Sequence, residues 1–139
     1  SQYSSTFNLL NDGYNPATMH ITSAKAWFAF ADDNDSAYEY VDITLDNLLL
    51  INDAEVDGSH AAYDWRSAGL TGQMLFQLQD GVISYTVKLL NTHGVNDVWL
   101  KVAKLKAYGD YKQVPDASAT VALMGLGLLG LAAARKRFR

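Results

Sequence analysis

The densest group of side chains able to bind a ligand in this sequence is acidic. Asp32, Asp33, Asn34 and Asp35 stand side by side, and Glu39 follows in the same stretch. Carboxylate and amide oxygens grouped on a loop suit Ca²⁺, although the spacing does not match an EF-hand. Asp and Asn are also common in solvated turns. These residues therefore predict either a calcium site or a solvated polar turn. Calcium is the only cofactor that the sequence suggests.

Aromatic side chains form a second group of interest, because their flat apolar faces can stack on sugars or anchor a core. The members of this group are Trp27, Trp65, Trp99, Tyr38, Tyr40, Tyr63 and His60. In β-rich proteins such rings belong to the core or to an interface more often than to a sugar site. Sugar binding is therefore the secondary interpretation.

Catalytic chemistry has little support. The chain contains no cysteine, which excludes disulfides, thiol catalysis and Cys-ligated zinc. His20, His60 and His93 stand in no recognisable pairing, and no G-x-S-x-G, H-E-x-x-H or P-loop motif is present. We expect no catalytic residues and no enzymatic activity.

Charge is divided unevenly along the chain. Residues 1–113 hold 7 Lys or Arg against 14 Asp or Glu, a net charge of −7, whereas residues 114–139 hold 4 against 1, a net charge of +3. An acidic body repels phosphate backbones, and the sequence shows no basic stripe. Nucleic acid is therefore not expected as a partner.

The elements that must position these residues are strands. A chain of 139 residues, 49% apolar and 12% aromatic, is long enough for one domain with its own core. The first 110 residues alternate between apolar and polar positions, as antiparallel strands with one buried face do. The alternation predicts strands at 6–10, 20–30, 38–45, 48–51, 60–65, 74–78, 82–90 and 96–108.

This pattern predicts an all-β fold, a single antiparallel β-sandwich of jelly-roll or immunoglobulin-like kind over residues 1–110. Gln-Asp-Gly at 79–81 predicts a tight hairpin turn before the strand at 82–90. The first ten residues are either the first strand of the sandwich or a segment that pairs with the open sheet edge of a neighbouring copy.

The C-terminal part has a different composition. Residues 121–134 are consecutive apolar or small residues, a short span for a helix that rises ~1.5 Å per residue through a ~30 Å hydrocarbon core. Arg135, Lys136, Arg137 and Arg139 follow at once, and such a cluster stays on the cytoplasmic side. We therefore expect one C-terminal hydrophobic helix that enters a membrane and leaves the body outside. A buried helix of a globular domain is the alternative.

Three glycines, Gly125, Gly127 and Gly130, lie inside this apolar run. They spell G-x-G-x-x-G, but no strand precedes them and no acidic residue follows, so a dinucleotide site is not expected. Small residues let two apolar helices approach closely. The three glycines are therefore predicted to pack helices together.

The motif Val114-Pro115-Asp116-Ala117 stands just before this run. A Val-Pro-acidic signature, then an apolar helix and a terminal basic cluster, resembles the PEP-CTERM family of bacterial sorting signals. That family's motif reads Val-Pro-Glu-Pro, and a Val-Pro-Asp variant class is similar to this sequence. The resemblance covers residues 114–139. It implies export by Gram-negative bacteria that make exopolysaccharide, processing by a membrane enzyme of the exosortase type, and an initial position of the helix in the inner membrane.

These observations divide the chain into an extracellular β-sandwich at 1–110, a hinge at 111–113 and a tail at 114–139. An apolar helix retained in the mature protein must be buried by lipid or by neighbouring copies. We therefore expect a non-enzymatic surface protein that assembles with itself into a filament, tube or matrix, with the helix packed between subunits. The alternative is a monomeric membrane-anchored module that binds calcium or exopolysaccharide and is released or re-anchored by the exosortase.

Overall fold

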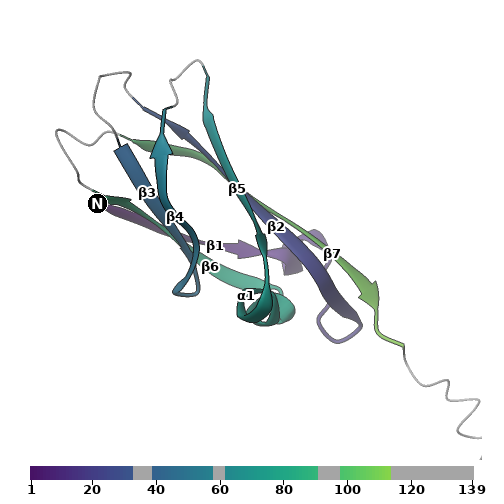
Figure 1. Ribbon diagram of the computed structural model, residues 1–139. Coiled ribbons are helices and arrows are strands. Elements are labelled where there is room, and N and C mark those ends of the chain that lie inside the picture. Colours follow the sequence, from purple (N-terminus) through teal and green to yellow (C-terminus); the bar gives the residue numbers. More distant parts are fainter. Residues whose placement is uncertain (33–38, 58–61, 91–97, 114–139) are drawn as a thin grey trace, which may run out of the picture.

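The computed structural model describes residues 1–32, 39–57, 62–90 and 98–113 (Figure 1). The elements within these ranges are, in chain order, β1 (Gln2–Asn8), the 3₁₀ turn η1 (Leu9–Asp12), β2 (Met19–Ala31), β3 (Glu39–Leu45), β4 (Leu48–Val56), β5 (Asp64–Leu70), α1 (Gly72–Gln77), the 3₁₀ turn η2 (Leu78–Asp80), β6 (Val82–Leu90) and β7 (Trp99–Tyr111). The prediction that strands dominate the body is confirmed.

The strands form two antiparallel sheets. One has four strands in the order β1-β6-β3-β4, and the other has three in the order β5-β2-β7. Figure 1 shows the two sheets as separate layers. β1 pairs with β6 along its full length, from Gln2 opposite Lys88 to Asn8 opposite Val82. The N-terminal segment is therefore the first strand of a sheet in its own chain.

Alternation along the strands builds one core between the two sheets. The inward residues of β2 and β6 are Ala24, Ala26, Phe28, Phe30, Ile83, Tyr85, Val87 and Leu89. The ring of Phe28 meets that of Tyr85 across the layers, with centroids 5.6 Å apart, and Phe7 of β1 stacks on Tyr85 at 4.6 Å. The body therefore has the two-layer arrangement of a β-sandwich.

The sequence did not predict the order of the strands. In the immunoglobulin fold the first, second, fourth and fifth strands share one sheet. Here β2 and β5 lie with β7, and β1, β3, β4 and β6 form the other sheet. The described strands therefore do not follow the immunoglobulin order, and the choice between a jelly-roll and an immunoglobulin-like sandwich stays a prediction.

Residues 74–78, predicted as a strand, belong instead to α1 and η2. Gly72 has a φ of 52°, a left-handed conformation that turns the chain out of β5. The segment from Gln73 onward is rich in Met, Leu and Gln, which favour helix, and lacks β-branched residues. The apolar alternation was misleading, because Leu78 is buried but Phe76 is 72% exposed.

Positive φ angles set two of the turns. Asp46 and Asn47, with φ of 42° and 66°, connect β3 to β4 in the manner of a type I′ hairpin. Gly81, with a φ of 90°, ends η2, so residues 79–81 lead from a 3₁₀ turn into β6 and do not close the expected hairpin. A Cβ at Gly81 would lie 2.7 Å from Leu10 Cδ2, so the position also requires the absence of a side chain.

β2 and β7 are the longest strands of the body. They pair from Met19 opposite Tyr111 to Ala31 opposite Trp99. Each has 13 residues, which corresponds to about 40 Å at a rise of roughly 3.3 Å per residue. This pair therefore spans the body from one end to the other.

A β-bulge interrupts the β2–β7 pair near the C-terminal end of β7. The register shifts between Ile21 and Ser23, and such a shift bends the strand locally. Gly109 lies against β2 at this point, where a Cβ would collide with the carbonyl oxygen of His20. Close approach of the two backbones therefore requires glycine at this position.

The two ends of the body differ in what they carry. The end of β2, the start of β3 and the start of β7 lie at one end, as does the N-terminus (Figure 1). We call this the loop end. The C-terminal end of β7 lies at the other end, together with η1 and α1. The tail therefore leaves the body far from the N-terminus.

Candidate functional site

The predicted sorting tail begins where the described residues end. Outside the described ranges lie the motif Val114, Pro115, Asp116 and Ala117, the glycines Gly125, Gly127 and Gly130, the basic residues Arg135, Lys136, Arg137 and Arg139, and the expected C-terminal helix. Within the described ranges, no helix has the length and apolar character needed to cross a bilayer. The point from which the tail leaves is nevertheless defined.

The residues from which the tail leaves the body are hydrogen-bonded to it. Tyr111 is the last residue of β7 and pairs with Met19. The backbone N–H of Lys112 donates to the carbonyl oxygen of Thr18 at 2.7 Å, and its Nζ donates to that of Pro16 at 2.5 Å. The first two residues of the expected hinge are therefore held against the segment that precedes β2.

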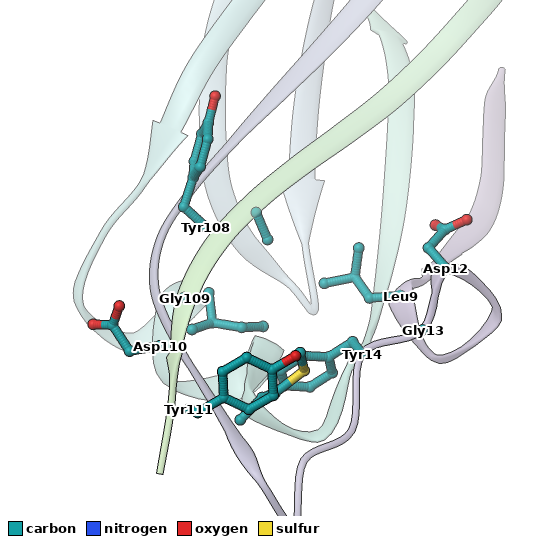
Figure 2. Close-up of a pocket in the computed structure, with 11 residues that line it drawn as sticks. Leu9, Asp12, Gly13, Tyr14, Tyr108, Gly109, Asp110 and Tyr111 are labelled. Carbon is teal, nitrogen blue, oxygen red and sulfur yellow. The ribbon is translucent and has the colours of Figure 1, made fainter. Parts of the chain in front are cut away.

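A pocket of about 250 Å³ opens beside this exit (Figure 2). Its walls include Leu9 and Met19. Figure 2 shows the rings of Tyr14 and Tyr111 at the bottom of the view, with Asp110 on the opposite side of β7. The described residues that line the pocket include no histidine, cysteine, serine or lysine, so they offer no nucleophile paired with a base.

Tyr14 closes the pocket from below and is held in its neutral form. Its hydroxyl donates to the carbonyl oxygen of Gln79 at 2.9 Å. Burial raises the pKa of Tyr14 above the ordinary 10.0, and the nearby Asp80 carboxylate raises it further. The tyrosine therefore joins η2 to the segment after η1, which is a structural role.

The acidic stretch is described only at its two ends. Asp32 follows β2 and is 6% exposed, and Glu39 begins β3 and is 2% exposed. Asp33, Asn34 and Asp35 lie outside the described residues. In the described ranges, no three His, Cys, Asp or Glu side chains are grouped so as to hold a metal ion. The two flanking carboxylates, however, lie inside the protein rather than in a solvated turn.

Of the three histidines considered for catalysis, His20 lies within the described residues. His20 stands opposite Asp110 in the β2–β7 register, and His60 and His93 lie outside the described residues. Asp64, which is close to His60 in sequence, forms an ion pair with Arg66 at 2.6 Å. Neither of these contacts pairs a nucleophile with a base.

The three tryptophans, by contrast, are brought together on one surface. Trp27 lies on β2, Trp65 on β5 and Trp99 on β7, all at positions that point away from the shared core. Tyr108 of β7, which sequence reasoning missed, shares this outer face of the three-stranded sheet. Trp65, Trp99 and Tyr108 are 49%, 40% and 56% exposed. The rings are therefore surface residues and not core anchors.

Small residues on β2 let two of these rings lie close to the sheet. Ala29 stands opposite Trp65, and Ala31 stands opposite Trp99. Neither alanine belongs to the core between the sheets, yet both are 0% exposed. Directly opposite side chains have Cβ atoms about 5 Å apart, so each tryptophan is next to a buried alanine on this face.

Four lysines occupy the same outer face. They are Lys25 on β2 and Lys101, Lys104 and Lys106 on β7. Residues 1–113 contain only 7 Lys or Arg, so these four are the majority of the body's cations. The expectation that the body has no basic stripe is therefore wrong.

The lysines and rings alternate along the strands and contact each other. The Nζ atoms of Lys25 and Lys101 lie 5.2 and 5.4 Å from the ring centroids of Trp27 and Trp99. Lys106 Nζ lies 4.9 Å from the Tyr108 centroid. These are cation–π distances. We call this surface of four aromatic and four basic residues the basic–aromatic face.

The other residues considered for sugar stacking lie elsewhere. Tyr63 is 43% exposed between β4 and β5, and Tyr38 and His60 lie outside the described residues. Tyr40 belongs to the four-stranded sheet. On the outer face of that sheet, Ser4 and Thr86 share a hydroxyl hydrogen bond of 2.8 Å. The two outer faces therefore differ in chemistry.

A family model described as a VPDSG-CTERM motif matches residues 113–138. The first three letters agree with Val114, Pro115 and Asp116, while Ala117 and Ser118 stand at the positions of Ser and Gly. This sorting signal is related to PEP-CTERM, and it indicates an exported protein directed to the cell surface. No curated protein matches the chain.

Proposed function

We propose that this chain is a non-enzymatic cell-surface protein whose tail is recognised by a membrane enzyme of the exosortase type. The observation that carries the proposal is the sorting motif matched at residues 113–138. The apolar run at 121–134 then enters the inner membrane, and the basic cluster that ends the chain stays in the cytoplasm. The β-body remains outside.

The position of the tail's exit suits this arrangement. The tail follows β7 directly, at the end of the body that carries η1 and α1. Lys112 is bonded to the segment before β2, so the body is attached at a fixed point. The loop end then faces away from the membrane.

The two prolines of the chain, Pro16 and Pro115, provide a matched test. In a host that carries an exosortase, we expect Pro115→Ala to leave the protein at full mass in the inner-membrane fraction. Pro16→Ala should leave sorting unchanged. The measurement is cell fractionation followed by intact-mass determination. Normal release of the Pro115→Ala protein, or full-length wild type in the cytoplasm, would contradict the proposal.

We further propose that copies which retain the tail assemble with one another. Two features support this: glycines within the apolar run suit close helix packing, and β1, β4, β5 and β7 each lie at an edge of their sheet as described. Electron microscopy of the cell surface should show filaments, tubes or a matrix in which intact mass includes residues 121–134. Dispersed monomers at full mass would instead favour the single anchored module.

A further inference from the structure

We propose that the basic–aromatic face binds an acidic polysaccharide, a linear chain of sugar rings that carry carboxylate or sulfate groups. The inference concerns the body alone, so it does not depend on how the tail is processed. Its basis is the gathering of most of the body's cations and all three tryptophans on one outer sheet face.

Like charges oppose each other on this face. Lys25 stands directly opposite Lys106, a pairing that destabilises a sheet. Lysines on an edge strand such as β7 are a common protection against aggregation. That explanation does not apply to Lys25, which lies on the central strand β2. An anionic partner would remove the repulsion and explain the lysines on both strands.

The aromatic rings add an apolar contribution beside the charges. Trp65 and Trp99 are 49% and 40% exposed, although burying such large rings is favourable. Each is opposite a small alanine of β2 in the register, and about half of each side chain is open to solvent. Sugar rings have apolar C–H faces that stack on such a surface, while their acid groups reach the neighbouring lysines.

The face has the shape for an extended chain. From Trp99 to Tyr108 it follows β7 for about 30 Å, at roughly 3.3 Å per residue. Across the three strands it is about 10 Å wide, at roughly 4.8 Å between strands. A long and narrow surface of this kind suits a linear polymer.

Two other partners fit less well. Protein interfaces are enriched in Arg and depleted in Lys, whereas all four cations here are lysines. Single-stranded nucleic acid also combines stacking with positive charge. The matched sorting motif, however, indicates an exported protein directed to the cell surface, where polysaccharide is a characteristic polymer. The acidic polysaccharide is therefore favoured, and the oligothymidylate probe tests the alternative.

The test measures binding of the purified full chain to immobilised alginate, a polyuronate, with neutral dextran and an oligothymidylate as comparison probes. The variants are the double substitution Lys25→Ser with Lys106→Ser, and the single substitution Trp65→Ala. Matched controls are Lys88→Ser, on the other sheet, and Phe76→Ala, an exposed ring on α1. Melting temperature is recorded for every variant.

We expect alginate binding that weakens with added salt and no binding to dextran. The double lysine variant and Trp65→Ala should each bind about tenfold more weakly, while both controls bind as wild type. The lysine variant should melt at or above the wild-type temperature, because a like-charge pair is removed. Equal affinity for dextran, tighter binding of the oligothymidylate at the same salt, or full affinity in the lysine variant would overturn the proposal.

Discussion

At the residue scale, two buried carboxylates flank the acidic stretch. Asp32 and Glu39 are almost fully buried, and carboxylates inside a protein require compensating charge or hydrogen bonds. Asp32 and Glu39 each already have an interaction partner within the protein, so their burial does not by itself call for an ion. Calcium binding by this stretch, with Asp33, Asn34 and Asp35, stays a prediction from the sequence. Millimolar Ca²⁺ should raise the melting temperature by about 5 °C or more over EDTA.

Paired variants make the calcium prediction specific. Asp32→Asn with Asp35→Asn should abolish the difference between calcium and EDTA, because two oxygen donors lose their charge. Asp57→Asn, an exposed carboxylate after β4, should preserve it. Differential scanning fluorimetry provides the measurement. Equal melting temperatures of the wild type in calcium and in EDTA would exclude the site.

Tyr14 gives the body a sensitivity to alkaline pH. Its folded-state pKa lies above 10.0, mainly because of burial. Below pH 10 both the folded and the unfolded chain keep the proton, so its contribution to stability is complete. Above pH 10 the unfolded chain loses the proton first, and stability falls as the pH rises.

Tyr14→Phe should therefore change two quantities. It removes the hydrogen bond to Gln79, which should lower the free energy of unfolding at pH 7 by about 0.5–1.5 kcal/mol. It should also reduce the further loss of stability between pH 7 and pH 10.5. Urea unfolding at both pH values measures this, with Tyr111→Phe, at a 75% exposed position, as the control. An unchanged pH dependence would contradict the assignment.

At the element scale, strands with regular alternation could be predicted from the sequence. β6 was predicted at 82–90 and has those bounds. β4 was predicted only as far as 51 but continues to Val56. The pattern failed there because Asp53 has a positive φ of 50° and its N–H donates to Asp42 Oδ1. An irregularity inside a strand breaks the period without ending the strand.

The basic–aromatic face could not be predicted in the same way. Lys25 and Lys106 are far apart in the sequence and meet only because β2 pairs with β7. Along β7, Lys101 and Lys104 are three residues apart, and a strict period of two assigns them to opposite faces. The register shift at Ala29 and Phe30 changes this assignment. Strand pairing and bulges were the missing information, whereas the sorting motif is local and was readable.

A substitution at Gly109 tests whether close packing of β7 against β2 at the bulge stabilises the body. In Gly109→Ala, the added Cβ meets the backbone of His20, so the strands must separate near the tail's exit. We expect a loss of about 2 kcal/mol or more in the free energy of unfolding. Gly69→Ala on β5 is the control, because its Cβ would lie 3.9 Å from the nearest atom, Ala24 O. Equal stability of the two variants in urea unfolding would refute this account of the bulge.

At the scale of the whole molecule, the body has a direction relative to the tail. β7 spans about 40 Å and delivers the tail from the end opposite to the N-terminus. Lys112 fixes that exit to the segment at Pro16 and Thr18. In a tail-anchored protein, the loop end, with Asp32 and Glu39, is then presented outward, and the basic–aromatic face stands along the side.

The absence of native cysteine allows this direction to be measured with single fluorescent labels. Ala17→Cys labels the segment beside the tail's exit, and Gln2→Cys labels the loop end; both positions are exposed. In vesicles that hold the full chain, a quencher carried by lipid headgroups should quench the label at 17 strongly and the label at 2 weakly, since residue 17 adjoins the segment bonded to Lys112 and residue 2 lies at the opposite end of the body. A soluble quencher should reach both equally, which controls for local burial. Equal lipid quenching, or stronger quenching at 2, would mean that the body lies flat or inverted on the membrane.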